Sequence, residues 1–213
     1  MKTFIGQMRI MSHRNFESQS KSCVAFSLVE VLVVMMLMGI MLALVVPSVS
    51  SMLGSNNLTQ AGQLIVDQVG LARQIASTRN CTVEIRLIAL PNLSPNGFSA
   101  MQLWAAPAAS GTNDMVPVDR LVTLPQGTTI SPDATKLSKL LSVTTATKTM
   151  STGVRYTAFQ IRASGNVTPA ATSMSDMYLT VIPTRFADAT TLPANYVIVQ
   201  INSNAGTTLV YRP

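Results

Sequence analysis

One carboxylate stands alone within the most apolar part of the sequence. The run from Phe26 to Val46 has 21 residues, and Glu30 is its only charged side chain. As a helix, this run would be about 31 Å long, which matches the hydrocarbon core of a bilayer. A carboxylate in that layer costs roughly 2.5–3.5 kcal/mol on insertion scales, so it normally has a function and a charged partner. Glu30 is therefore the first candidate for chemistry in this chain.

Few other side chains offer catalytic chemistry. The only histidine, His13, lies before the apolar run, as does Cys23. If that segment is removed, no general-base histidine remains, and Cys81 alone forms neither an intrachain disulfide nor a zinc site. We expect Cys81 to be a small buried strand residue. Asp133 and Asp188 lack the Asp-Thr/Ser-Gly pattern of aspartic proteases, so we expect solvated loop aspartates. The sequence predicts no enzyme, no cofactor and no metal site.

The composition favours a β domain outside the cytoplasm. The chain is 47% apolar but only 11% charged, whereas ordinary soluble domains are about one quarter charged. Its 23 Thr and 21 Ser supply much of the polar surface. Residues 1–25 carry four basic side chains and one acidic side chain, so they hold +3 of the net charge of +6. The remaining +3 is too small to indicate a nucleic-acid partner by itself.

A basic stretch followed by an apolar run has three interpretations: a secretory signal, a plain membrane anchor or a prepilin leader. A secretory signal has a core of about 7–15 residues and is cut on its far side after small residues, whereas here two valines precede Pro47. A plain anchor explains the length but not Glu30. The near side reads Val24-Ala25-Phe26-Ser27-Leu28-Val29-Glu30. It closely resembles the type IV prepilin signal, which has a small residue, then Phe, then Glu at the fifth mature position.

The resemblance implies a role for each of these residues. A prepilin peptidase would cut between Ala25 and Phe26 and methylate the Phe26 amine; Ala25 replaces the usual Gly. That amine would neutralise Glu30 of a neighbouring subunit, an attraction of roughly 4 kcal/mol at 4 Å and an effective dielectric of 20. Pro47 would be the twenty-second mature residue, where pilins commonly carry a helix-bending proline. Alternatively, Pro47 only marks the membrane exit.

The elements that must position these residues follow from periodicity. Residues 48–80 predict an amphipathic helix that ends at Asn80, with a break at Gly54-Ser55-Asn56-Asn57. Its apolar face comprises Ala61, Leu64, Ile65, Ala72, Ile75 and Ala76. Beyond it, alternating patterns predict strands at 81–90, 98–105, 120–124, 156–162, 177–182, 196–201 and 208–211. Residues 106–118 and 125–153 predict long loops, with one helical turn at 135–141.

These elements predict an α+β fold in which a long N-terminal hydrophobic helix packs on an antiparallel β-sheet domain. The C-terminal half of the helix should shield the sheet, and its N-terminal half should enter the membrane. The expected order is a prepilin leader (1–25), a transmembrane helix half (26–47), an amphipathic helix half (48–80) and a β-rich globular domain (81–213). Trp104 is expected in the core of that domain.

The globular domain is similar to minor pseudopilins of the GspH/FimT group. Two stretches carry this resemblance: Phe159-Gln160-Ile161-Arg162-Ala163-Ser164-Gly165-Asn166, and Tyr196-Val197-Ile198-Val199-Gln200-Ile201 followed by Gly206. A narrower resemblance is to the subfamily known as Verru_Chthon cassette protein D. It rests on Leu58-Thr59-Gln60-Ala61-Gly62-Gln63, Leu71-Ala72-Arg73-Gln74, Thr78-Arg79-Asn80 and Val210-Tyr211-Arg212-Pro213.

The resemblance implies a minor pilin or pseudopilin that joins other pilin subunits in a type IV pilus-like or type II secretion filament. It implies a single-pass protein of the bacterial inner membrane, with its C-terminal domain in the periplasm or on the filament. One alternative is DNA uptake, but the turn at 204–208 has no arginine and Arg212 is the only cation nearby in sequence, so DNA is an unlikely partner. The other alternative is a non-polymerising binding module that uses Trp104 and the Thr-rich loops.

Overall fold

The computed structural model describes residues 27–94, 96–106, 115–143, 148–150, 152–168 and 177–213, and only the backbone at 44–53 and 143. Contacts divide the chain into two compact units, Met1–Val45 and Val46–Pro213. The first helix, α1 (Leu28–Arg79), has 52 residues and contributes to both units. The domain boundaries predicted after residues 25, 47 and 80 stay predictions.

Both ends of α1 are capped by its own sequence. At the N-terminus, the Glu30 backbone N–H donates to Ser27 Oγ at 3.1 Å, so Ser27 is the N-cap and Glu30 the third helical residue. At the C-terminus, Asn80 has a φ of 47°, and the Cys81 N–H donates to the Ala76 carbonyl at 3.1 Å. This left-handed cap confirms the end that Asn80 predicts.

The break predicted at residues 54–57 is wrong, because α1 is helical throughout this stretch. Poor helix propensity is offset here by tertiary contacts. The Arg212 guanidinium donates to Ser55 Oγ and Thr59 Oγ1, and Leu58 is buried in the core. The Asn57 side chain also donates to the Gln126 carbonyl at 3.0 Å.

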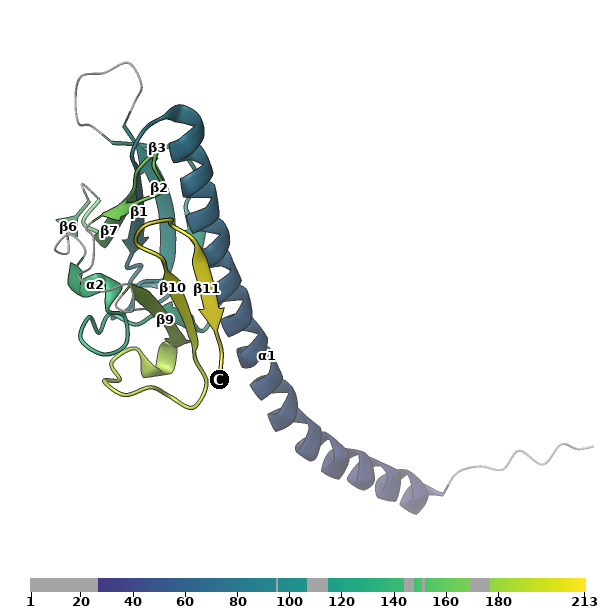
Figure 1. The fold of residues 1–213 in the computed structure, drawn as a ribbon. Coiled ribbons are helices and arrows are strands. Elements are labelled where there is room, and N and C mark those ends of the chain that lie inside the picture. The colour runs from purple at the N-terminus through teal and green to yellow at the C-terminus, as the bar shows by residue number, and fades with distance from the viewer. Residues whose placement is uncertain (1–26, 95, 107–114, 144–147, 151, 169–176) are drawn as a thin grey trace, which may run out of the picture. The chain divides into compact units, whose positions relative to one another are not determined.

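Two antiparallel sheets follow α1, not the single sheet predicted (Figure 1). The first sheet has the order β3-β2-β1-β7-β6, with β4 also paired to β2 and β8 to β7. Its strands are β1 (Val83–Ile88), β2 (Ala100–Ala105), β3 (Val116–Pro117), β4 (Val122–Thr123), β6 (Lys148–Thr149), β7 (Arg155–Ile161) and β8 (Val167–Thr168). The second has the order β11-β10-β9-β5, from β5 (Thr128–Ile130), β9 (Tyr178–Pro183), β10 (Val197–Ile201) and β11 (Thr208–Tyr211).

The C-terminal part of α1 packs with both sheets around one core. The helix contributes residues at 3–4-residue spacing that are at most 1% exposed: Leu58, Ala61, Ile65, Val69, Ala72 and Ala76. The first sheet contributes Val83, Ile85 and Leu87, and the second Val197, Val199 and Ile201. This arrangement confirms the predicted α+β class and the shielding of the sheets by the amphipathic part of α1.

The long loop predicted at 125–153 is wrong, because it contains β5, β6 and a short helix, α2 (Leu140–Val143). All three residues of β5 are buried, and they pair with β9, more than 50 positions away. Such a pairing leaves no local signal in a Thr- and Gly-rich stretch. The 106–118 loop likewise contains β3, and the 120–124 strand shortens to β4. The helical turn predicted at 135–141 is shifted, since α2 begins at Leu140.

Candidate functional site

The candidate N-terminal site is described only from Ser27 onward. Ala25 and Phe26, the predicted cleavage and methylation residues, lie outside the described residues. Glu30 is exposed in the first turn of α1, where an acidic side chain favours the positive end of the helix dipole. With Ser27 as N-cap, Ser27-Leu28-Val29-Glu30 has the spacing of a capping box. Ser27 and Glu30 form an S-x-x-E pattern, so this cap was readable from the sequence alone.

The helix surface that follows Glu30 is apolar and exposed. Every large apolar side chain from Leu28 to Leu42 is 45–82% exposed. Within the described part of the chain, no helix reaches the combined length and hydropathy of a membrane span. The backbone at position 47 is helical, but the Pro47 side chain lies outside the described atoms. The bend assigned to Pro47 stays a prediction.

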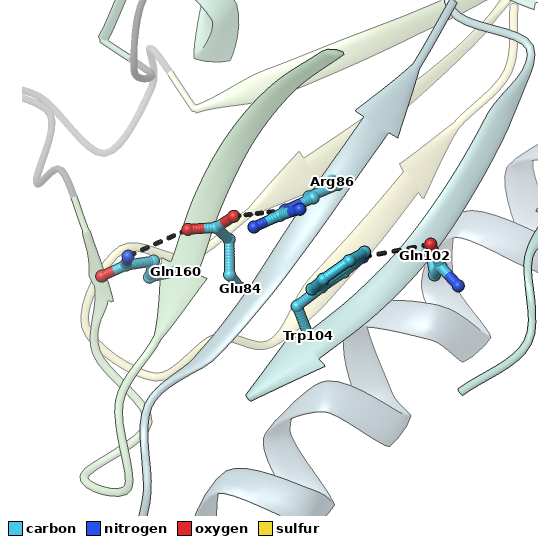
Figure 2. Close-up of polar contacts among 5 residues, drawn as sticks. All are labelled: Glu84, Arg86, Gln102, Trp104 and Gln160. Carbon is cyan, nitrogen blue, oxygen red and sulfur yellow. Dashed lines mark hydrogen bonds and ion pairs between the residues drawn. The ribbon is translucent and has the colours of Figure 1, made fainter. Parts of the chain in front are cut away.

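The outer face of the first sheet carries a polar and aromatic cluster of Glu84, Arg86, Gln102, Trp104 and Gln160 (Figure 2). These residues lie on neighbouring strands because Glu84 pairs with Trp104 across β1 and β2, and with Gln160 across β1 and β7. Arg86 Nε donates to Glu84 Oε1 at 2.6 Å, and Gln160 Nε2 donates to Glu84 Oε2 at 3.3 Å. The two oxygens of this buried carboxylate are thus both satisfied.

Aromatic rings enclose the cation of this cluster. The Arg86 guanidinium carbon lies 3.8 Å from the Trp104 ring centroid and 4.7 Å from that of Tyr156. The Trp104 indole N–H donates to Gln102 Oε1 at 3.1 Å. Trp104 is half-buried on the outer face of β2, so its predicted place in the core is wrong. The indole has a polar N–H, and this face provides a partner for it.

The chemistry of this cluster is that of a satisfied network and not of catalysis. Its only acid is paired with its only cation, and both side chains are 12–13% exposed. The cluster contains no hydroxyl or thiol nucleophile beside a base. Side chains alternate between the two faces of a strand, so Glu84 and Arg86 lie on the same face of β1. The sequence could therefore have indicated this ion pair. The partners on β2 and β7 depended on strand register.

The two glycine turns of the family resemblance pack against each other. Gly165 has a φ of 89° and Gly206 a φ of 60°. A Cβ at position 206 would lie 2.9 Å from the Gly165 carbonyl oxygen, so this approach requires glycine. The Val167 N–H donates to the Ser203 carbonyl at 2.8 Å and links the two sheets beside these turns. The turns therefore have a structural role where the chain returns between strands.

The positions of the arginines correct one premise about DNA. Arg212 binds Ser55 and Thr59 of α1, whereas Arg73 lies beside the C-terminal turn. The Cδ of Arg73 is 3.9 Å from where a Cβ at Gly206 would stand. Arg212 is therefore not the only cation available to that turn. Arg73 and Gly206 lie 133 positions apart, so no local sequence pattern connects them.

Asp133 and Asp188 do not form a carboxylate pair. Asp188 accepts from Asn96 Nδ2 at 2.7 Å, whereas the Thr135 hydroxyl donates to Asp133 Oδ1 at 2.6 Å. The Thr135 hydroxyl, with the backbone N–H groups of Thr135 and Lys136, lowers the pKa of Asp133 below its ordinary value. Asp188 is exposed as predicted, while Asp133 is half-buried in a hydrogen-bonded turn.

Cys81 also departs from expectation. It is a half-buried free cysteine just before β1, which begins at Val83, so it is not a buried strand residue. Across the described ranges, no group of three His, Cys, Asp or Glu side chains has the geometry to hold a metal ion.

No protein-family model matches the chain, and no curated protein matches its sequence. Among solved structures, the chain is similar to the type IV minor pilin FimU of Pseudomonas aeruginosa strain PAO1, with a TM-score of 0.43 and 14% identity. The match covers 74% of this chain and 93% of FimU. At this TM-score the similarity carries no argument about what this chain does. The narrower resemblance to Verru_Chthon cassette protein D stays a prediction.

Proposed function

We propose that this chain is a minor pilin or pseudopilin subunit. A prepilin peptidase cuts it between Ala25 and Phe26, and its N-terminal helix assembles with other pilin subunits into a type IV pilus-like or type II secretion filament. Its place is the bacterial inner membrane, with the β domain in the periplasm or on the filament. The resemblance of Ala25-Phe26-Ser27-Leu28-Val29-Glu30 to a prepilin signal supports this proposal.

One observation carries the proposal furthest: the first part of α1 is apolar on all sides and exposed within its own chain. A helix that is apolar all round is stable when lipid or other helices cover it. Glu30 is the only charged residue in the run from Phe26 to Val46, so an amine on Phe26 of a neighbour is its matching partner. The rest of the molecule is a β domain suited to a filament surface.

Two variants separate the charge pair from helix capping. Glu30→Gln keeps a side chain that suits the third position of a capping box but removes the charge. Ser27→Ala removes the cap oxygen and keeps the charge, at a cost of about 1 kcal/mol of helix stability. We expect Glu30→Gln to be processed and inserted but to fail to cross-link to neighbouring subunits, and Ser27→Ala to cross-link normally.

The test begins with the mass of the mature N-terminus, which should correspond to a methylated Phe26. Retention of Met1, or a start near Ser48, contradicts the processing step. Normal cross-linking of Glu30→Gln contradicts the charge pair. Equal failure of Glu30→Gln and Ser27→Ala would assign the defect to capping instead.

DNA uptake is the second candidate function, and Arg73 beside the Gly206 turn is the observation that favours it. One arginine supplies few phosphate contacts, so we expect weak binding with a log-log salt slope of about one or two. Titration of the chain with duplex DNA across a salt series tests this. Submicromolar affinity at physiological salt that Arg73→Gln abolishes would make DNA uptake the better proposal.

A further inference from the structure

A pocket of about 480 Å³ lies within the β-domain unit, where α1 meets the turn before β5 and the end of β9. Its walls include Gly54 and Asn57 of α1, Gln126 before β5, and Asn195 before β10. Thr184 and Arg185 line it from a short 3-10 helix, η2 (Thr184–Phe186). This volume is in the range of small-ligand sites.

Hydrogen bonds hold the walls of the pocket together. Asn57 Nδ2 donates to the Gln126 carbonyl at 3.0 Å, which joins α1 to the turn before β5. The Thr184 N–H donates to the Gly127 carbonyl at 2.9 Å, which joins the same turn to η2. These two hydrogen bonds connect three of the segments that line the pocket.

Two groups that line the pocket have unused hydrogen-bonding capacity. Thr184 Oγ1 is buried and has no hydrogen-bond partner among the described residues. The Arg185 guanidinium lies 4.9 Å from the Phe186 ring centroid and forms no ion pair with any described carboxylate. The lining includes neutral amides from Asn57, Gln126 and Asn195, and no acidic side chain is among its described members. The ligand that suits this set is an anion with several acceptor oxygens.

We propose that this pocket binds a phosphoryl group. A guanidinium donates two hydrogen bonds in a geometry that matches the oxygens of a phosphate and neutralises its charge, and a hydroxyl and carboxamide N–H groups can donate the remaining hydrogen bonds. Thr184 Oγ1 would then gain the partner that it lacks among the described residues, since buried polar atoms are normally satisfied. Arg185 supplies the charge, and Thr184 and Asn195 supply orientation.

The position of Gly54 indicates an anionic lipid headgroup as the source of this phosphate. Gly54 follows Pro47, the predicted membrane boundary, by seven residues, which is about 10 Å along a helix. The headgroup layer extends about 5–7 Å beyond the hydrocarbon core, so Gly54 lies about 3–5 Å past its outer edge and the lipid phosphates are the nearest abundant oxyanions. This lipid assignment rests on the proposed function, whereas the phosphate site itself does not.

The site is tested first with inorganic phosphate and the full chain in micelles of an uncharged detergent. Calorimetric titration at constant ionic strength should give a Kd of about 1 mM, with chloride as the reference anion. Arg185→Gln and Gly54→Leu should each weaken binding at least tenfold, because the first removes the charge and the second fills the pocket. A Cβ at Gly54 meets no atom within 4 Å, so the leucine should not disturb packing.

A matched control is Arg120→Gln, which removes an exposed cation that is not among the pocket-lining residues. It should bind phosphate as the unmodified chain does. No phosphate binding by the unmodified chain, or equal binding by Arg185→Gln, overturns the proposal.

The source of the phosphate is tested with nanodiscs of phosphatidylcholine, with and without phosphatidylglycerol. If the ligand is a lipid, phosphatidylglycerol should compete and weaken the apparent phosphate affinity of the unmodified chain but not of Arg185→Gln. Phosphate binding without this competition supports the site and assigns it to a soluble phosphorylated ligand. Because the micelle titration needs no processing at Phe26, failure of the phosphate site and failure of the proposed function give separate results.

Discussion

The two parts of α1 share one helical backbone but differ in how their apolar side chains are covered. From Leu28 to Leu42 the large apolar side chains are 45–82% exposed, whereas Ile65 and Val69 are fully buried. The second part alternates apolar and polar residues at helical spacing, and the first part has no polar face apart from Glu30. The comparison shows that apolar content does not decide burial; the presence of a facing surface in the same chain does.

This difference assigns the two parts different physical tasks. The amphipathic part of α1 stabilises the β domain, because its apolar stripe faces both sheets. The uniformly apolar part contributes nothing to that core among the described contacts. Its large apolar side chains are exposed among the described residues, and this exposure is the premise of the proposed assembly.

The largest predicted effect comes from a pair of truncations in α1. Ile65→Ala removes a fully buried side chain and should lower the free energy of unfolding of the β domain by about 2–5 kcal/mol. Met38→Ala removes a side chain that is 60% exposed and should change it by less than about 0.5 kcal/mol. Urea unfolding of the full chain in micelles, followed by Trp104 fluorescence, measures both. Equal losses would contradict the division of tasks.

The same contrast explains which parts of the fold were predictable. The buried stripe of α1 followed from the spacing of Ala61, Ile65, Ala72 and Ala76, and β1 from the alternation of its residues. Both signals are local. β5 was missed because its burial comes from pairing with β9, and the second sheet was missed because a sequence pattern does not say where one sheet ends.

The residues of the candidate sites also divide into those with a local sequence signal and those without one. Glu30 stood out because a lone charge in an apolar run is a local anomaly, and Ser27 three residues before it was a readable cap. The position of Trp104 beside Arg86 depended on the register of β1 and β2. The pocket around Arg185 joins residues from α1, β5 and β9, which have no common pattern in the sequence.

Two glycines in α1 provide a second test of the contrast between its two parts. A Cβ at Gly62 would lie 2.7 Å from Val197 Cγ1, whereas a Cβ at Gly39 would meet nothing within 4 Å. Gly62→Ala should therefore destabilise the β domain by about 1–2 kcal/mol, the overpacking cost exceeding the gain in helix propensity. Gly39→Ala should leave thermal unfolding of the domain unchanged. A more stable Gly62→Ala variant would show that α1 can shift away from β10.

A smaller effect on stability is expected at the start of the amphipathic part of α1. Arg212 holds the end of β11 against Ser55 and Thr59 of the helix. These bonds are exposed, so Arg212→Ala should cost only about 0.5–1 kcal/mol. Hydrogen exchange should become faster in residues 208–211 and stay unchanged in β9, with Arg120→Ala as the control. Unchanged exchange in β11 would mean that pairing with β10 alone holds the strand.

The smallest predicted effect is a pH dependence of stability that arises from Asp133 in the β domain. Hydrogen bonds from Thr135 and Lys136 favour the charged form of Asp133, so its pKa is lower in the folded chain than the unfolded value of about 3.9. A lowered pKa stabilises the fold fully above the unfolded value, and this stabilisation is lost as the pH falls through the folded value. Asp133→Asn should be slightly less stable at pH 7 and should lose less stability between pH 5 and pH 3.

Thr135→Val should show part of the stability loss that Asp133→Asn shows at pH 7, since the Thr135 hydroxyl is the largest cause of the lowered pKa of Asp133. Thermal unfolding of both variants and their double mutant measures the coupling, and fully additive losses would show that the Thr135 hydroxyl does not act through Asp133.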